Sequence, residues 1–107
     1  MPNQIDHLFK AIADPTRREI FHVLVLASTA LPISKVAQEF NISRQGVTKH
    51  IKLLENAGLV DIVSKGREKF CYVNPAPLKM IIDWVAEYDK FWDNSLSKLD
   101  SYLKSKK

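Results

Sequence analysis

The sequence predicts a mainly α-helical domain with one small β-hairpin, in the order α-α-α-α-β-β-α. Two short amphipathic helical patterns within residues 33–56 are separated by a three-residue break. Two runs rich in β-branched and aromatic residues follow within residues 59–74, with a glycine between them. A long amphipathic pattern over residues 78–103 comes last. Because 107 residues suit one domain with one modest core, residues 1–107 are expected to form a single domain.

Two helices are expected within residues 1–27, the first over about residues 3–13. The second is expected to begin at Pro15, because Asp14 is a good N-cap and the missing N–H of proline would be unpaired at that position anyway. Apolar residues recur at helical spacing at Ile5, Leu8, Phe9, Ile12, Ile20, Val23 and Leu24. Arg17 and Arg18 are expected to point outward.

Residues 33–56 predict a helix, a tight turn and a second helix, with Asn41 ending the first helix and Ser43 capping the second. The inward positions are Val36, Ala37, Phe40, Val47, Ile51 and Leu54. The outward face of the second helix carries hydrogen-bond donors and no acidic residue: Arg44, Gln45, Thr48, Lys49 and Lys52. A helix-turn-helix places such a helix in the major groove of DNA. The alternative is a helical hairpin with a solvated outer face.

A β-hairpin with a basic tip is predicted directly after this helix, at residues 59–74. Its strand sequences, LVDIVS and FCYV, flank KGREK, which contributes Lys65, Arg67 and Lys69. Between Arg44 and Lys69 lie six basic and three acidic residues, against ten and nine in the rest of the chain, so most of the net charge of +4 is found here. A hairpin in this place is typical of the wing of a winged helix, whose basic tip reaches phosphate or the minor groove. The alternative is an ordinary solvated turn.

The last predicted helix, residues 78–103, has apolar positions spaced alternately near three and four, as in a coiled-coil seam. At ~1.5 Å per residue it would be roughly 40 Å long. A domain of this size cannot cover such a helix alone, so we expect a second copy of the chain to pack on it. The alternative is that the helix only caps its own domain.

Other classes of function find little support. No apolar run approaches the ~20 residues that span a bilayer, and no secretory signal is evident, so no membrane association is expected. A single cysteine fits the reducing cytoplasm, and Cys71 is expected to be a packed residue. No nucleotide loop, paired-cysteine motif or nucleophile elbow is present. His7, His22 and His50 lie on three different predicted elements. We therefore expect neither an enzyme nor a cofactor.

The chain resembles the ArsR family of winged helix-turn-helix repressors over nearly its whole length. The resemblance is carried by LFKAIADPTRREIFHVL (residues 8–24), ISKVAQEFNISRQGVTKHIKLLENAGLV (residues 33–60) and KGREKFCYV (residues 65–73). MarR-type regulators share the second kind of block, and a MarR-type regulator responding to a small organic ligand stays open as an alternative. The resemblance implies a cytoplasmic homodimer that binds double-stranded DNA at an operator near a promoter and represses transcription.

The candidate DNA-binding residues are Ser43, Arg44, Gln45, Thr48, Lys49, Lys52, Lys65, Arg67 and Lys69. His50 is expected to be packed and hydrogen-bonded rather than in contact with a base. The resemblance also implies that the first and last helices form the dimer interface, with candidates Leu8, Phe9, Trp84, Tyr88, Trp92, Leu96, Leu99 and Leu103.

The chain departs from the family's metal sensors. Their helix-turn-helix carries two cysteines where this chain has Pro32 and Ser34, and the last helix here has carboxylates but no histidine. No metal site is therefore expected, and the aromatic last helix is similar to a metal-free branch, often encoded beside a START-like ligand-binding protein. The sequence names no inducer. A rival function is a winged helix that binds another protein within an assembly, although such modules usually lose the basic reading face.

Overall fold

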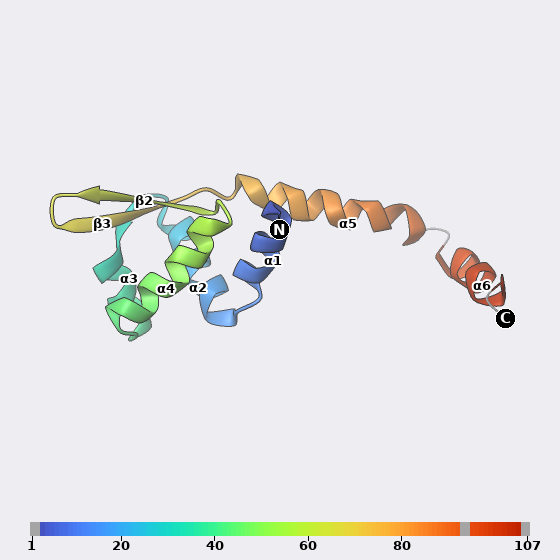
Figure 1. Cartoon of the computed structure of the whole chain (residues 1–107), viewed down its shortest axis with the longest axis horizontal. Helices are drawn as coiled ribbons and strands as arrows, with labels where there is room; N and C mark the ends of the chain where they lie inside the picture. Colours follow the sequence, from blue (N-terminus) through green and yellow to red (C-terminus); the bar gives the residue numbers. More distant parts are fainter. Residues whose placement is uncertain (1–2, 93–94, 106–107) are drawn as a thin grey trace.

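The computed structural model describes the backbone of residues 3–92 and 95–105, and side chains of residues 3–89 and 99–105. Its elements are α1 (Gln4–Ile12), α2 (Pro15–Ala27), β1 (Leu31–Pro32), α3 (Ile33–Phe40), α4 (Arg44–Asn56), β2 (Val60–Lys65), β3 (Glu68–Val73), η1 (Ala76–Leu78), α5 (Lys79–Trp92) and α6 (Ser95–Ser105). Figure 1 shows α1 to α4 gathered into one body, with the β2–β3 hairpin at one end. Helix α5 extends from the other end, and the molecule measures 64 × 28 × 22 Å.

The first two helices begin as the sequence predicts. Asn3 caps α1 in a reciprocal capping box with Asp6. Asp14 caps α2, where its carboxylate accepts a hydrogen bond of 2.9 Å from the Arg17 amide, and Pro15 takes the first helical position. This hydrogen bond lowers the pKa of Asp14, because it stabilises the ionised carboxylate.

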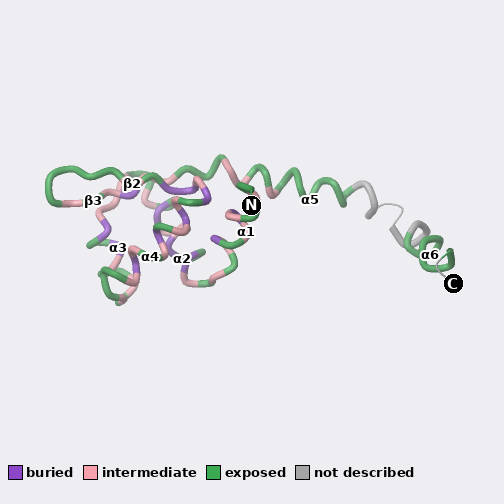
Figure 2. The backbone as a smooth tube through the Cα atoms, viewed as in Figure 1, coloured by how far each residue is buried: buried purple, intermediate pink, exposed green. Residues whose placement is uncertain are grey.

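One core joins α1 to α4 and the sheet, and Figure 2 shows its buried segments within that body. The predicted inward positions Val36, Val47, Ile51 and Leu54 are all fully buried. Ala37 and Phe40 are partly buried against the same core. The remaining buried apolar residues are Leu8, Ala11, Ile20, Leu24, Ile33, Ala57, Leu59, Val60 and Cys71.

The sheet has three antiparallel strands in the order β1-β3-β2, one strand more than predicted. The additional strand, β1, has only two residues and therefore no periodicity that a sequence pattern could reveal. Cys71 lies on the central strand, opposite Leu31 on one side and Ile62 on the other. It is fully buried, as expected for a packed residue, and burial raises the pKa of its thiol to about 11, with a further contribution from Glu55. At neutral pH the thiol therefore stays protonated and unreactive.

The hairpin turn is tighter than predicted. The strands pair as far as Lys65 and Glu68, so only Gly66 and Arg67 form the turn. Gly66 has φ +64°, a conformation that other residues rarely adopt. Lys65 and Lys69, expected at the tip, consequently lie on the strands, and Arg67 alone of the three basic residues lies in the turn.

The predicted single helix over residues 78–103 is described as a short 3-10 turn, η1, followed by α5 and α6. Residues 93–94, between the two longer helices, lie outside the described residues. The axes of α5 and α6 run in different directions in Figure 1. Among the described residues, no helix is both long enough and apolar enough to cross a membrane.

Candidate nucleic-acid interface

Helix α4 is held in place by its apolar side and by its first turn. Val47, Ile51 and Leu54 are buried, which leaves the opposite face of the helix in contact with solvent. Asn41 ends α3 in the left-handed conformation (φ 51°), and the Ser43 hydroxyl caps α4 by accepting a hydrogen bond of 3.0 Å from the Gly46 amide. The turn chemistry predicted from the sequence is therefore confirmed.

Gly46 allows a close approach between this turn and α4. A Cβ atom at this position would lie 2.8 Å from Cγ2 of Ile42 and 3.2 Å from Oγ of Ser43. Real Cβ atoms do not approach other heavy atoms as closely as the first distance. The absence of a side chain thus lets Ile42 pack against the core while Ser43 caps the helix.

The solvent face at the start of α4 is the candidate reading face. Arg44, Gln45, Thr48 and Lys49 together line a hollow of about 540 Å³. The Thr48 hydroxyl donates its proton to the Arg44 carbonyl oxygen at 2.8 Å, so it can offer only its lone pairs to DNA. The Ser43 hydroxyl accepts the cap hydrogen bond and keeps its own proton as a donor. Arg44, Gln45 and Lys49 are the charged or amide donors that line this hollow.

Two of the remaining candidates are held by neighbouring side chains. Lys52 forms an ion pair of 3.9 Å with Glu55 on the same helix. On the wing, the ammonium group of Lys65 lies 5.8 Å from the ring centre of Phe70 and 5.5 Å from that of Tyr72. These cation–π contacts hold the Lys65 amine against the hairpin. Lys69 and Arg67 are exposed.

Arg17 corrects the sequence analysis, which placed it outward. Its side chain is only 8% exposed. The guanidinium donates to the carbonyl oxygens of Ala11 at 2.7 Å and Lys10 at 3.0 Å, and its third nitrogen lies 3.2 Å from Nδ1 of His50. Because arginine has no acceptor, Nδ1 of His50 accepts that hydrogen bond. His50 is therefore a hydrogen-bonded packing residue, as expected, and the end of α1 is tied through Arg17 to α4.

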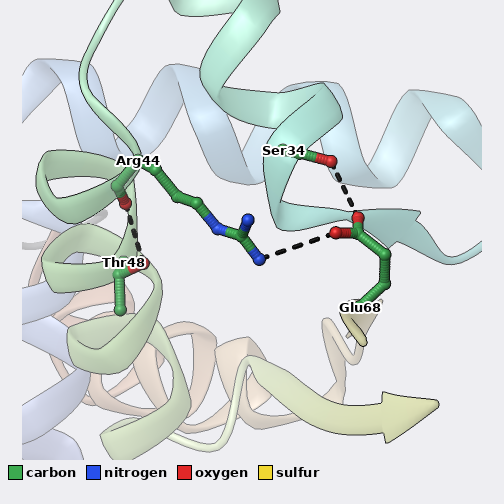
Figure 3. A network of polar contacts seen from close by, with 4 residues as sticks. All are labelled: Ser34, Arg44, Thr48 and Glu68. Carbon is green, nitrogen blue, oxygen red and sulfur yellow. Dashed lines mark hydrogen bonds and ion pairs between the residues drawn. The ribbon is translucent and has the colours of Figure 1, made fainter. Parts of the chain in front are cut away.

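A carboxylate that the sequence analysis did not select meets the reading face. Figure 3 shows Glu68, the first residue of β3, between Ser34 of α3 and Arg44 of α4. Its Oε2 accepts a hydrogen bond of 2.8 Å from the Ser34 hydroxyl, and its Oε1 lies 3.6 Å from Nη2 of Arg44. Sequence reasoning counted Glu68 as an acidic residue of the wing tip. No periodicity or motif could have placed it beside Arg44, 24 positions earlier.

A second surface, formed by α1 and α5, is apolar. Trp84 makes edge-to-face contacts with Phe9 of α1, at 5.1 Å between ring centres, and with Tyr88, at 5.2 Å. Large apolar side chains of α5 remain exposed: Met80, Ile82, Trp84, Val85 and Tyr88. On α6, Leu99, Tyr102 and Leu103 are more than half exposed.

Three of the expected interface residues need separate comment. Leu8 is 0% exposed in the isolated chain, so it belongs to the chain's own core and offers no surface to a partner; that assignment was wrong. Its place in the periodic pattern of α1 could not distinguish burial within the chain from burial between chains. The side chains of Trp92 and Leu96 lie outside the described residues.

The geometry agrees with known proteins. A helix-turn-helix domain model matches residues 12–63. Transcriptional repressor SdpR of Bacillus subtilis (strain 168) is 30% identical over 92 residues, which cover 86% of this chain and 100% of that protein. The crystal structure of an ArsR family transcriptional regulator, RHA00566, has a TM-score of 0.76 and 30% identity, covering 87% of this chain and 94% of that one. A solution structure from Mycobacterium bovis, described as a homodimeric winged helix-turn-helix DNA-binding domain, shares the fold (TM-score 0.64, 18% identity, 79% of this chain and 80% of that one).

Proposed function

Because this chain belongs to the ArsR family of winged helix-turn-helix transcriptional regulators, we propose that it acts as a homodimeric repressor at an operator near a promoter. The observation that carries the proposal is the solvent face of α4, where Arg44, Gln45 and Lys49 surround one hollow and no acidic residue lies between Arg44 and Lys52. Hydrogen-bond donors in this arrangement suit the acceptor-rich edges of bases in the major groove.

The three donors of the reading face are suited to different partners. Arg44 is the first residue of α4 and can donate two parallel hydrogen bonds to O6 and N7 of guanine. Gln45 can form the corresponding bidentate pair with adenine. Lys49, one turn further along the helix, is suited to phosphate or to a guanine edge. Thr48 can offer only its lone pairs, because its proton is donated within α4, whereas the Ser43 hydroxyl keeps its proton for a phosphate oxygen.

The wing supplies contacts that do not depend on base sequence. Arg67 lies in the two-residue turn, and Lys65 and Lys69 lie on the strands beside it. We propose that these three residues bind flanking phosphates, together with Lys52 of α4. Contacts of this kind set the register of the protein on the duplex and make binding salt-dependent.

A dimer supplies the second reading helix. We propose that the aromatic surface of Phe9, Trp84 and Tyr88, extended by the apolar residues of α5, packs against its symmetry mate. Leu99 and Leu103 of α6 would extend the same interface. Two reading helices related by a two-fold axis would then enter successive major grooves, about 34 Å apart. Bound at a promoter, such a dimer would block access of polymerase.

The rival functions are weaker. An assembly module has no need for Arg44, Gln45 and Lys49 around one hollow, and this chain keeps all three there. The relatives above are transcriptional regulators, and nothing in the described residues favours a catalytic role. Because a repressor of this kind binds chromosomal DNA, we expect the protein to be cytoplasmic.

The proposal predicts sequence-selective, salt-dependent binding. Fluorescence anisotropy would compare duplexes covering the DNA upstream of the gene with a scrambled duplex, over a range of potassium chloride concentrations. Affinity should fall linearly on a log–log plot against salt, because phosphate neutralisation releases counterions. Absence of binding to every duplex at low salt would contradict the proposal and favour a protein-binding module.

Substitutions separate base contacts from phosphate contacts. Arg44→Ala and Gln45→Ala should each lower the preference for the operator by about 1–3 kcal/mol, the value of a good bidentate base contact. Arg67→Ala should weaken binding to all duplexes alike and reduce the salt dependence by about one counterion. Lys35→Ala, an exposed lysine of α3 paired with Glu39, serves as a control for loss of one positive charge. An equal loss of preference in all four variants would contradict this assignment.

A further inference from the structure

We propose that Glu68 is a positioning residue for Arg44, and that this carboxylate increases discrimination between bases while lowering affinity for DNA in general. The inference rests on the proposed function, because it concerns the same reading face. It assigns a role to the acidic wing residue, which would otherwise oppose binding to a polyanion.

The first observation is that the carboxylate is held on one side only. The Ser34 hydroxyl donates to Oε2 of Glu68 at 2.8 Å, which anchors the carboxylate to the first turn of α3. The other oxygen, Oε1, lies 3.6 Å from Nη2 of Arg44. In Figure 3 the side chain of Glu68 reaches from β3 toward both residues. Three separate elements thus converge on one carboxylate, whose second oxygen is oriented toward the reading arginine.

The second observation is that the contact with Glu68 leaves N–H donors of Arg44 available for DNA. At 3.6 Å the ion pair is longer than a hydrogen bond, and the two side chains are 53% and 37% exposed, so the pair adds little to stability. A guanidinium has five N–H donors, and the 3.6 Å contact with Glu68 is made through Nη2. Arg44 therefore keeps donors for a guanine edge while its long side chain is attracted to one side of the hollow.

The consequence for recognition follows from electrostatics. Without the carboxylate, Arg44 would turn to whichever phosphate is nearest, and that contact carries no sequence information. With the Glu68 carboxylate present, the Arg44 side chain is already oriented over the reading face before DNA binds. On a duplex with the wrong base at this position, the Arg44 guanidinium stays paired with Glu68 and gains no contact with DNA. A fixed negative charge close to the duplex also repels phosphates, which weakens binding to all sequences. The carboxylate thus increases selectivity among sequences while it lowers affinity for DNA in general.

The test uses Glu68→Gln, which removes the charge and keeps the shape. Its matched control is Glu39→Gln, which removes a carboxylate from α3 that pairs with Lys35 instead of Arg44. Affinity is measured for the operator, for single-base-pair variants of it and for a scrambled duplex. Glu68→Gln should bind the scrambled duplex more tightly than Glu39→Gln does. Its preference should fall at the base pairs where Arg44→Ala loses preference, and at no others.

Two further variants separate positioning from a general structural effect. Ser34→Ala should reproduce part of the loss of preference, and Ser34→Thr, which keeps the hydroxyl, should retain the wild-type preference. In an Arg44→Ala background, Glu68→Gln should cause no additional loss of preference, because the residue through which Glu68 acts is absent. Circular dichroism should give the same thermal midpoint for all of these exposed-site variants.

Failure of the proposed function and failure of the positioning role of Glu68 give different results. If the wild-type protein binds every duplex equally, the proposed function fails before any variant is needed. If the wild type discriminates but Glu68→Gln behaves like Glu39→Gln, or loses preference equally with and without Arg44, the positioning role is overturned.

Discussion

At the scale of single residues, a buried cation ties α4 to the end of α1. Arg17 donates to two carbonyl oxygens at the end of α1 and to the ring of His50 on α4. The last carbonyls of a helix have no partner within it, and here one side chain satisfies two of them while reaching a third element. A lysine, with a compact ammonium group, cannot reproduce this fork.

We therefore predict that Arg17→Lys destabilises the protein by about 2 kcal/mol, the typical loss for hydrogen bonds to a charged group in a buried place. Urea unfolding at one fixed protein concentration would measure it. Arg67→Lys, at an exposed position in the hairpin turn, should change stability by less than about 0.5 kcal/mol. Similar values for both variants would show that the buried network contributes little.

At the scale of elements, the turn between α3 and α4 depends on the absence of a side chain at Gly46. Glycine inside a helix is ordinarily unfavourable by ~1 kcal/mol relative to alanine, so propensity alone predicts that Gly46→Ala is stabilising. The structure reverses the sign, because the new methyl group would lie 2.8 Å from Cγ2 of Ile42. Overpacking of this kind costs about 1–3 kcal/mol.

Gly46→Ala is thus expected to lower both stability and operator affinity, because the first turn of the reading helix must shift. The pair Ile42→Ala and Ile42→Ala/Gly46→Ala isolates the cause, since Ile42→Ala removes Cγ2. In that background Gly46→Ala should cost clearly less than in the wild type, by a double-mutant cycle in urea. An unchanged cost would place the strain elsewhere, for example at Ser43 Oγ, which lies 3.2 Å away.

At the scale of the whole molecule, the chain is elongated because α5 and α6 leave the body that the other elements form (Figure 1). Large apolar side chains remain exposed on both helices, including Val85, Tyr88 and Leu99. On α5 these side chains adjoin the Trp84–Tyr88 pair, and contiguous apolar surface of this kind marks an interaction site. Its continuity with the Phe9–Trp84–Tyr88 cluster favours a second copy of the chain as the partner.

The double variant Val85→Asp/Tyr88→Asp should be monomeric by size exclusion with light scattering. Both side chains are about half exposed in the single chain, at 44% and 50%, and neither belongs to the buried core. Operator affinity should fall toward that for a scrambled duplex, because one reading helix is lost. Val63→Asp introduces an aspartate at a similarly exposed apolar position on the wing, where Val63 is 40% exposed. This control variant should remain dimeric. A double variant of dimer mass would assign the interface to another surface.

Much of the fold was predictable because its signals are local. The caps at Asp14 and Ser43, the end of α3 at Asn41 and the glycine turn of the hairpin depend on a few consecutive residues, and the structure confirms each of them. Helical spacing identified the buried side of α4 for the same reason. The candidate reading face was then predicted as the opposite, solvent-exposed side of the same helix.

Only the tertiary structure decided which distant residues meet. Periodicity reports that a position is apolar, not whether its own chain or a partner buries it, so Leu8 was assigned to an interface and lies in the core. Arg17 looked like a surface cation because the carbonyls it binds are formed by the end of another helix. Strand β1 exists because β3 pairs with it. Glu68 faces Arg44 because the hairpin folds back beside α3 and α4, an arrangement that no short stretch of sequence contains.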